Sequence, residues 1–329
     1  MATGLQRMIT AQPDVLEHLA TADLTAEVST LRAADRIIIV GTGTSFHAAE
    51  LGALLYRGAG VDAISVPAVE AARGCTGSLT GAAYVIISHT GSTSYARSLR
   101  KAVQAARRPL VTITGQRSGW AEAIKTPAEE ASETYTVSYT AALAVLGLLG
   151  HQLAGTPTGP DDLRRAAGAV RDVISEPAVA QISVPARALA IVGADSWAIT
   201  AREGALKIRE AARILAEGFD PERLLHGAAV PYTAEDVLIG LQPDMDPDGL
   251  TSLLLDAARA EGITTYVLAD QHADLHPFLR QLPATVRLQL LASLLADAKG
   301  TDPDVAITGA WAREALWSSG DPTGSGQQQ

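Results

Sequence analysis

The amino-acid sequence predicts an α/β protein made of two doubly wound parallel-sheet lobes in tandem, each a flavodoxin-like sandwich. Short apolar runs alternate with helix-forming segments along the chain, which is the pattern of parallel strands joined by crossover helices. Hydrophobic residues make up 47% of the 329 residues but aromatic residues only 4%, so the core must consist of Ala, Leu, Val and Ile. The sequence of strand, glycine-containing turn and helix restarts in the second half of the chain, which predicts the second lobe.

The first lobe is predicted over residues 35–155. It follows an N-terminal helical segment, 1–34, in which Pro13 and Asp23 are expected to break or cap helices. Each predicted strand is a short apolar run, and helical segments rich in Ala or Leu follow. The predicted strands are Arg36–Val40, Val61–Val66, Ala83–Ile87 and Leu110–Thr114, and the predicted helices are His47–Gly58, Tyr95–Arg108 and Ser138–Leu153.

A Gly- and Pro-rich stretch, Gly150–Asp161, ends the first lobe. We expect a linker over 156–180, a second lobe over 181–317, and a Gly-, Ser- and Gln-rich tail over 318–329 that is disordered. The predicted strands after the linker are Arg187–Val192, Val237–Leu241, Thr264–Leu268 and Thr285–Leu288, and the predicted helices are Asp162–Ile174, Trp197–Glu217 and one that begins near Gln289.

Composition excludes several classes of protein. The net charge of −10 and the lack of a Lys/Arg run argue against a surface for nucleic acid or for an anionic membrane. The one cysteine, Cys75, excludes an internal disulfide and a cysteine metal cage. No His, Asp and Glu cluster has metal-ligand spacing, so neither a metal nor a cofactor is expected. The N-terminus has no apolar signal region and no run of about 18 apolar residues occurs, so we expect a cytoplasmic protein without a membrane span.

Two hydroxyl-rich loops each lie between a predicted strand and a predicted helix. Gly41–Ser45 reads Gly-Thr-Gly-Thr-Ser, and Ser88–Thr93 reads Ser-His-Thr-Gly-Ser-Thr. Helix N-termini bind anions through their N–H groups, and the hydroxyls add donors, so both loops are candidate phosphate sites. The alternative for either loop alone is a capped strand-to-helix turn. The candidate ligands are Gly43, Thr44, Ser45, Ser88, His89, Thr90, Gly91 and Thr93.

A third hydroxyl-rich segment, Thr134–Thr140, precedes the helix at Ala141. Ser138 and Thr140 are therefore further candidates for sugar binding, and the alternative is a polar turn with a helix cap.

Charged residues recur on one face of the predicted helix Trp197–Glu217. Glu203, Lys207 and Glu210 are spaced i, i+4 and i+7, so their side chains share a helix face. The alternative is a surface ladder of salt bridges, which Glu217 would extend. His226 is predicted in the loop after this helix, where an isolated histidine is more often solvated than catalytic.

Together these segments resemble the double sugar isomerase (SIS) domain family. That family includes the isomerase half of glutamine–fructose-6-phosphate aminotransferases, together with stand-alone fructosamine-6-phosphate deglycases and amino-sugar phosphate deaminases. The resemblance covers about Arg36 to Asp304. The matching segments are Gly43-Thr-Ser45, Ser88-x-x-Gly-x-Thr93, Glu203-Gly-Ala-Leu-Lys-x-x-Glu210, His226-Gly227 and Lys299-Gly-Thr-Asp302.

The resemblance implies that the first two motifs hold a phosphorylated sugar. The second loop of the family usually reads Ser-Gln-Ser-Gly-Glu-Thr, so His89 stands here for a glutamine and Ser92 for a glutamate, which changes the polarity of the loop. The hydroxyl ligands are retained, and phosphate binding remains the expectation. The residues that carry over as ligands are Ser45, Ser88, Thr90 and Thr93, with Thr140 on the third substrate segment.

The resemblance also implies catalytic roles. Glu210 falls on the carboxylate that moves a proton between C1 and C2 of the sugar, work that suits a partly buried carboxylate. Lys207 falls on a residue that can steady the enolate oxygen. His226 falls on the histidine that opens the sugar ring or acts as acid and base. In the family this histidine reaches the neighbouring subunit's site, which implies a homodimer.

Two departures narrow the expected reaction. Synthase members carry a Schiff-base lysine at the position of Trp311, and the chain lacks a glutaminase domain, so glutamine-dependent synthesis is not expected. We expect a ketosamine-6-phosphate deglycase or an amino-sugar phosphate deaminase or isomerase that uses Glu210 and His226. The alternative is a non-catalytic, regulatory sugar-phosphate-binding protein. Trp311 and the altered loop favour it, whereas pure binding would require neither Glu210 nor His226.

Overall fold

The computed structural model describes residues 2–74, 81–269 and 272–318. Cys75 and all of the predicted tail except Ser318 lie outside these residues. The chain divides into two compact units, which are described separately here. Unit 1 consists of Met1–Pro13, Ala131–Thr136 and Arg165–Ala306, and unit 2 of Asp14–Glu130, Val137–Arg164 and Ile307–Gln329. Two helices, α1 (Gly4–Leu19) and α7 (Pro160–Ser175), contribute residues to both units.

Unit 2 contains a parallel five-stranded sheet with the order β2-β1-β3-β4-β5, the flavodoxin-like order of a doubly wound fold. Its strands are β1 (Arg36–Gly41), β2 (Ala63–Pro67), β3 (Ala82–Ile87), β4 (Leu110–Gly115) and β5 (Ile124–Thr126). Its helical elements are α2 (Thr25–Arg32), α3 (Thr44–Gly58), α4 (Ala68–Ala72), α5 (Ser94–Ala105), α6 (Val137–Ala154), η3 (Gly309–Ala312) and α12 (Glu314–Ser318).

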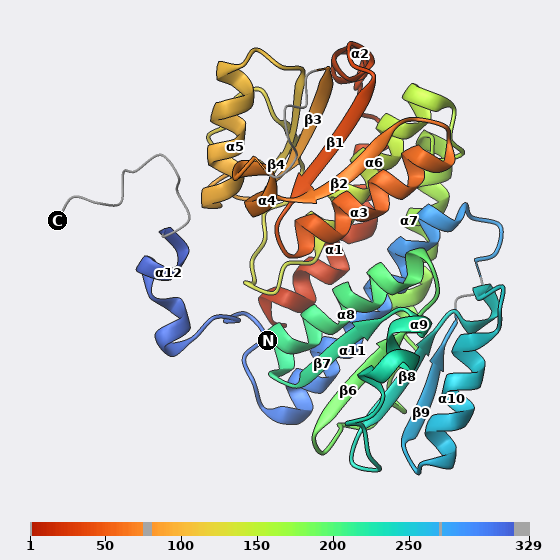
Figure 1. Cartoon of the computed structure of the whole chain (residues 1–329). Coiled ribbons are helices and arrows are strands. Elements are labelled where there is room, and N and C mark those ends of the chain that lie inside the picture. The colour runs from red at the N-terminus through yellow and green to blue at the C-terminus, as the bar shows by residue number, and fades with distance from the viewer. Residues whose placement is uncertain (1, 75–80, 270–271, 319–329) are drawn as a thin grey trace. The chain divides into compact units, whose positions relative to one another are not determined.

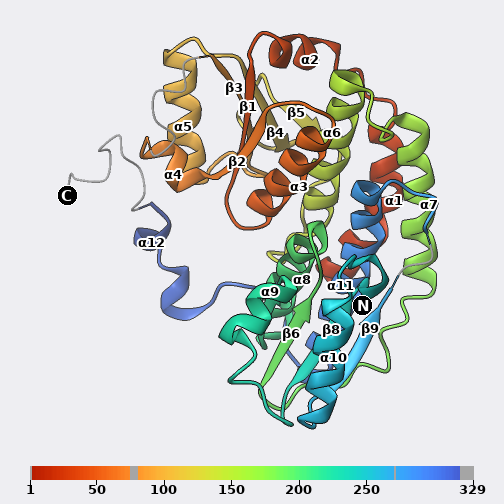
Figure 2. The ribbon, with the colours of Figure 1, turned by 45° about the vertical axis from the view of Figure 1, so that its right-hand side comes forward.

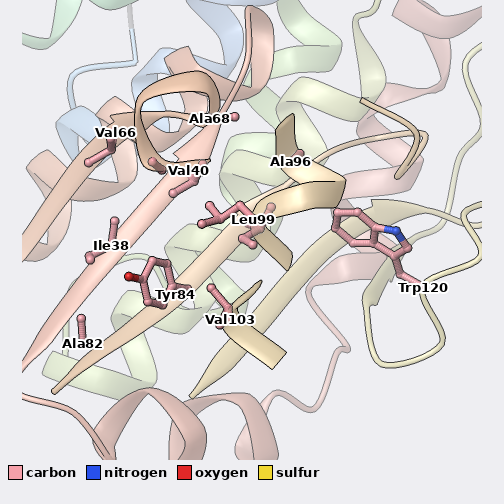
Figure 3. Close-up of a cluster of buried hydrophobic side chains, with 12 residues drawn as sticks. Ile38, Val40, Val66, Ala68, Ala82, Tyr84, Ala96, Leu99, Val103 and Trp120 are labelled. Carbon is pink, nitrogen blue, oxygen red and sulfur yellow. The ribbon is translucent and has the colours of Figure 1, made fainter. Parts of the chain in front are cut away.

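Helices cover both faces of this sheet, with α3 and α6 on one side and α4 and α5 on the other (Figures 1 and 2). Alternate residues of a strand point to opposite faces, so β1 contributes to both cores. Ile38 and Val40 belong to the cluster that includes Leu99 of α5 and Trp120 (Figure 3). Ile39 lies on the other face, beside Gly52 of α3. Strands buried on both sides read as continuous apolar runs, which is why the sequence pattern located them.

Unit 1 contains a parallel four-stranded sheet with the order β7-β6-β8-β9. Helices α8 and α11 pack on each other, and α8 also packs on β6 and β7. A core cluster on β6 and β8 joins the sheet to α10 through Leu254 and Leu255. The elements are β6 (Ala188–Val192), α8 (Ser196–Ala212), β7 (Leu215–Phe219), α9 (Pro221–Arg223), η1 (Leu224–Ala228), β8 (Val237–Leu241), η2 (Pro243–Met245), α10 (Leu250–Ala260), β9 (Thr264–Leu268) and α11 (Pro277–Lys299). The predicted fold class, two parallel-sheet α/β lobes, is confirmed.

Two predicted elements of unit 1 are wrong. Thr285–Leu288 is not a strand but part of α11, where Leu288 is buried and packs closely on Gly204 of α8. The helix predicted over Trp197–Glu217 ends at Ala212, and the chain continues as β7. Glu217 therefore lies on a strand, and it does not extend the charged face of the helix. In both cases the packing of neighbouring elements decided the structure of a short segment whose pattern was ambiguous.

Three smaller differences concern unit 2 and the N-terminus. The short elements α4 and β5 were not predicted. Pro13 lies inside α1 and does not end it, whereas Asp23 accepts hydrogen bonds from the backbone N–H and hydroxyl of Thr25.

Among the described residues one helix, α6, is long and apolar enough by composition to cross a membrane, with a mean hydropathy of 1.4 over 18 residues. The prediction that no such run exists is therefore wrong for α6. The helix is 72% buried inside the protein, and Tyr56 of α3 donates a hydrogen bond to its Leu146 carbonyl. Burial of this kind is what a core helix of an α/β sandwich shows.

Candidate functional site

The first hydroxyl loop follows β1 and ends at the start of α3. Gly41 has no room for a side chain, because a Cβ would lie 2.3 Å from the Ser45 carbonyl oxygen. Gly43 has φ 55° and ψ −128°, a conformation that favours glycine, and no side chain caps the helix. Thr42 and Gly43 are exposed, and Thr44 and Ser45 are half-buried at the first turn of α3. The turn thus presents backbone and hydroxyl groups at a helix N-terminus.

The second hydroxyl loop joins β3 to α5. The Ser88 hydroxyl donates to Thr93 Oγ1 (3.4 Å), and the Thr90 and Ser92 hydroxyls are 2.6 Å apart. Ser88 is buried, whereas Thr90, Ser92 and Thr93 are exposed. Gly91 has φ 68° and lies against Ser118, so a side chain there would clash. Because β1 and β3 are paired in parallel, both hydroxyl loops lie at the carboxyl edge of the same sheet.

His89, in the same loop, contacts Gly115, the last residue of β4, and Glu129, which follows β5. Its imidazole packs on Gly115, and its Nε2 lies 3.8 Å from Oε2 of Glu129. Its side chain is 9% exposed. Burial lowers the pKa of His89, and the Glu129 carboxylate opposes this effect by raising it. Glu129 lies 40 positions further along the chain than His89, so sequence spacing gave no sign of the pair.

Polar groups of the third candidate segment, Thr134–Thr140, make local hydrogen bonds at the start of α6. The backbone N–H and the hydroxyl of Ser138 both donate to Glu130, at 2.8 and 2.7 Å. Thr140 is buried, and its hydroxyl donates to the Val137 carbonyl. These contacts correspond to the alternative interpretation of the segment, a polar turn with a helix cap.

A buried charged cluster lies on α8 of unit 1. Lys207 Nζ is 2.5 Å from Oε2 of Glu210 and 3.6 Å from Oε1 of Glu203. The side chains of Glu203 and Lys207 are 0% and 1% exposed, whereas that of Glu210 is 22% exposed. The cluster is thus not the surface ladder offered as the alternative. One carboxylate and the ammonium are sealed, and the second carboxylate remains open to solvent.

His226 is much more exposed than the residues of the α8 cluster. It lies in η1, where its own backbone and that of Gly227 depart from helical geometry. Its imidazole is 72% exposed and lies 3.4 Å from Glu222. His226 thus contacts Glu222, whereas Lys207 and Glu210 contact each other. Glu217, now on β7, lies 3.8 Å from Arg209 and accepts a hydrogen bond from the Tyr232 hydroxyl.

The remaining matching segment, Lys299–Asp302, has structural contacts in unit 1. The Thr301 hydroxyl donates to the Ala211 carbonyl at the end of α8. Two residues on, the Asp304 carboxylate accepts from the backbone N–H groups of Gly4 and Leu5 at the start of α1. This segment therefore ties together the ends of three helices.

From Ile307 onward the chain belongs to unit 2. Trp311, expected from the family resemblance at the position of the synthase lysine, is 76% exposed in η3. The Ser94 hydroxyl, at the first residue of α5, donates to the Trp317 carbonyl. The sequence pattern gave no signal for this contact between the C-terminal segment and the second hydroxyl loop's helix. Within the described ranges, no group of three or more His, Cys, Asp or Glu side chains could hold a metal ion.

Comparisons with known proteins agree with this architecture, although no protein-family model matches the chain. The glutamine–fructose-6-phosphate aminotransferase of Pyrococcus horikoshii is 30% identical over 304 residues, covering 82% of this chain and 50% of that protein. The one from Lactiplantibacillus plantarum is 26% identical over 341 residues, covering 90% of this chain and 55% of that protein. The chain spans about half the length of these curated relatives.

Solved structures show the same fold over nearly the whole chain. The C-terminal domain of glucosamine-fructose-6-phosphate aminotransferase from Francisella tularensis has a TM-score of 0.81 at 21% identity, covering 92% of this chain and 98% of that one. Glucosamine-6-phosphate deaminase from Thermotoga maritima has a TM-score of 0.77 at 19% identity, covering 92% and 97%. Tagatose-6-phosphate ketose/aldose isomerase from Escherichia coli has a TM-score of 0.77 at 16% identity, covering 93% and 96%. Sequence and fold together identify the chain as a member of the double sugar isomerase (SIS) domain family and a homologue of the isomerase part of glutamine–fructose-6-phosphate aminotransferase.

Proposed function

We propose that the chain is an enzyme that moves a proton between C1 and C2 of a hexose 6-phosphate. The reaction would be that of a ketosamine-6-phosphate deglycase or of an amino-sugar phosphate deaminase or isomerase. One observation carries the proposal: on α8 a solvent-open carboxylate, Glu210, is held by the buried ammonium of Lys207. A reactive carboxylate has to be both accessible and fixed in position, and this arrangement provides both.

The hydroxyl loops of unit 2 support phosphate as the recognised group. Thr44 and Ser45 lie at the first turn of α3, and Ser88, Thr90 and Thr93 precede α5. Helix N-termini favour anions, and a phosphate dianion accepts hydrogen bonds from backbone N–H and hydroxyl groups together. The sugar would be fixed through its phosphate, and the carbons to be changed would be those at the other end of the molecule.

The proton transfer can be written with named groups. The Glu210 carboxylate takes a proton from C1 of the ketose or ketosamine, the electrons of that C–H bond form a C1=C2 double bond, and the C2 oxygen takes up a proton. Return of a proton to C2, with loss of the proton on the C1 oxygen or nitrogen, forms a carbonyl or imine at C1. In the imine case water then releases the amine. Lys207 compensates the charge of Glu210 while the carboxylate is ionised.

His226 is proposed to act in the site of a second copy within a homodimer. Its side chain is exposed, and Leu225 and Val230 nearby in the chain are exposed apolar residues. The dimer can be tested by mixing E210Q with H226N. If each histidine serves the other copy's site, the mixed dimer contains one intact site, and activity returns on mixing. Activity that stays lost contradicts the shared site.

Trp311 favours a second candidate, a regulatory protein that binds a sugar phosphate without turnover, because synthases carry a reactive lysine at this position. Turnover separates the two functions. The wild type, E210Q and the matched control E217Q, which changes a carboxylate on β7, would be incubated with fructose 6-phosphate, glucosamine 6-phosphate and a fructosyl-amino-acid 6-phosphate. We expect amine or aldose release from one substrate with the wild type and E217Q only. Thermal stabilisation without product, unaffected by E210Q, would favour the regulatory protein.

A further inference from the structure

His89 is the one titratable residue within the second hydroxyl loop, Ser88–Thr93. It lies between Ser88 and Thr90, two of the proposed phosphate ligands. Consecutive Cα atoms are about 3.8 Å apart, so the imidazole lies within ~10 Å of an anion bound by its neighbours. This distance is close to the Debye length, which is about 8 Å at physiological ionic strength, so the two charges influence each other.

The structure holds His89 against Gly115, the last residue of β4. The backbone N–H of Gly115 donates to the His89 carbonyl (2.8 Å), and the imidazole rests on Gly115 where any Cβ would lie 2.5 Å from its Cε1 atom. A second close contact lies nearby, where Gly91 packs against Ser118. Gly91 and Gly115 thus allow the second hydroxyl loop to pack closely on the chain between the end of β4 and β5, and the His89 imidazole is part of this contact.

The charged group that faces His89 is Glu129. Its Oε2 is 3.8 Å from the imidazole Nε2, and its Oε1 accepts from the backbone N–H of Arg117 (2.7 Å). On β5, the Lys125 ammonium is engaged by Thr114 Oγ1 and the Ser118 carbonyl. Glu130, next in the chain, is engaged by Ser138. A carboxylate therefore stands beside a loop that is proposed to bind a phosphate dianion.

We propose that His89 and Glu129 form the specificity-determining pair of the phosphate loop, in which His89 takes up a proton when a phosphate dianion binds. The inference rests on the proposed phosphosugar function. In the free protein burial lowers the pKa of His89, which favours the neutral imidazole, while Glu129 opposes this shift. An arriving dianion brings a second negative charge near an imidazole that already lies 3.8 Å from Glu129, and both charges stabilise the imidazolium. The imidazolium in turn offsets the repulsion between the phosphate and the carboxylate, so the loop favours dianionic ligands and binds them more tightly as the pH falls.

Proton uptake on binding tests the proposal. Fructose 6-phosphate would be titrated calorimetrically at pH 7.5 into the full chain in buffers of different ionisation enthalpy, and affinity would be measured from pH 8 to pH 6.5. The variants are H89Q, which carries the residue usual in the family, and E129Q, which keeps the imidazole but removes its partner. H18Q, an exposed histidine on α1, is the matched control.

The wild type and H18Q are expected to take up protons that H89Q does not take up, with E129Q between them. As the pH falls from 8 to 6.5, the affinity of the wild type for fructose 6-phosphate should rise. The limit for one linked proton is about tenfold per pH unit. The phosphate group itself titrates near pH ~6 in every variant, so the difference between variants isolates His89. Equal uptake by the wild type and H89Q, or by the wild type and E129Q, overturns this inference while the proposed function stands. If the wild type does not bind any phosphosugar, both fall.

Discussion

The turn from β1 to α3 in unit 2 and the turn from β6 to α8 in unit 1 have the same backbone but different chemistry. Gly43 has φ 55° and ψ −128°, and Asp195, at the corresponding position before α8, has φ 51° and ψ −123°. Only the first is a glycine, although this conformation disfavours other residues. Unit 2 thus has a glycine at the N-cap of α3, whereas unit 1 has an acidic residue, Asp195, at the N-cap of α8, without a side-chain cap hydrogen bond.

A second pair of loops shows the same contrast. The loop from β3 to α5 exposes three hydroxyl residues, Thr90, Ser92 and Thr93. In the loop from β8 to α10, Asp246 accepts hydrogen bonds from both the N–H and the hydroxyl of Thr251. Negative side chains next to the N-termini of α8 and α10 would repel a phosphate. The difference shows that one scaffold, used twice, carries hydroxyl-rich turns in unit 2, where we propose that the phosphate binds, and the buried charged cluster of α8 in unit 1.

The largest expected effect concerns the buried charged cluster on α8 of unit 1. K207M leaves the carboxylate of Glu203 buried without its cation, and removal of one partner of a buried ion pair costs about 3–5 kcal/mol. Urea denaturation should show this loss as a lower midpoint with an unchanged slope. E217Q, on the surface of the same unit, is the control and should change stability little. A K207M protein as stable as the wild type would show that Glu203 and Lys207 do not form a buried ion pair.

The next effect tests whether the open N-terminus of α3 is the phosphate site. G43D copies into unit 2 the residue that unit 1 carries at the same φ and ψ. Beyond Gly43 and its chain neighbours no heavy atom lies within 4 Å of the added Cβ, although the positive φ strains any side chain there. A carboxylate ~6 Å from a single negative charge at an effective dielectric of ~20 costs about 3 kcal/mol, so fructose 6-phosphate, whose phosphate carries up to two, should bind at least about 100-fold more weakly. Isothermal calorimetry measures the change.

D195G is the matched variant for that experiment. It makes the reverse exchange in unit 1, removes a strained non-glycine conformation, and should leave fructose 6-phosphate affinity unaltered. Equal weakening by G43D and D195G, or none by G43D, would contradict the division of roles between the two turns.

The smallest effect is a pH dependence of stability that arises in unit 2. Burial holds the pKa of His89 below its usual value of 6.5 in the folded protein, so the unfolded chain binds more protons in the window below pH 6.5. This group therefore contributes a stability that is present above pH 6.5 and is lost as the pH falls through that window. H89Q should flatten the fall of the free energy of unfolding between pH 7 and pH 5, as followed by urea denaturation. A slope as steep as that of the wild type would contradict the burial of a neutral imidazole.

The sequence predicted the parts of the fold that are buried on both sides. Arg36–Val40 and Val237–Leu241 are continuous apolar runs, and they are strands in the structure. The prediction from sequence failed where tertiary packing decides whether a segment is helix or strand. Leu215–Phe219 contains a glutamate and a glycine, and α8 ends before it at Arg213 in a left-handed conformation that glycine would normally signal. Thr285–Leu288 has β-branched residues typical of a strand but packs as helix against α8.

For the candidate site, sequence spacing was sufficient where residues lie on one helix. The i, i+4 and i+7 positions of Glu203, Lys207 and Glu210 predicted their shared face, but only the structure gives their burial. Partners distant in the chain could not be predicted. Glu129 reaches His89 because Gly115 lets two segments approach, and single-sequence reasoning has no measure of such an approach.

Hydrogen exchange at the sugar carbons tests most directly the claim that Glu210 moves a proton at C1–C2 of a bound hexose 6-phosphate. The wild type and E210Q would be incubated with fructose 6-phosphate in D2O, and loss of the C1 proton signal would be followed by NMR together with binding. We expect exchange catalysed by the wild type and an exchange rate about 10²–10⁴-fold lower in E210Q, with binding retained. Binding by the wild type without exchange, or exchange by E210Q at the wild-type rate, would contradict the claim.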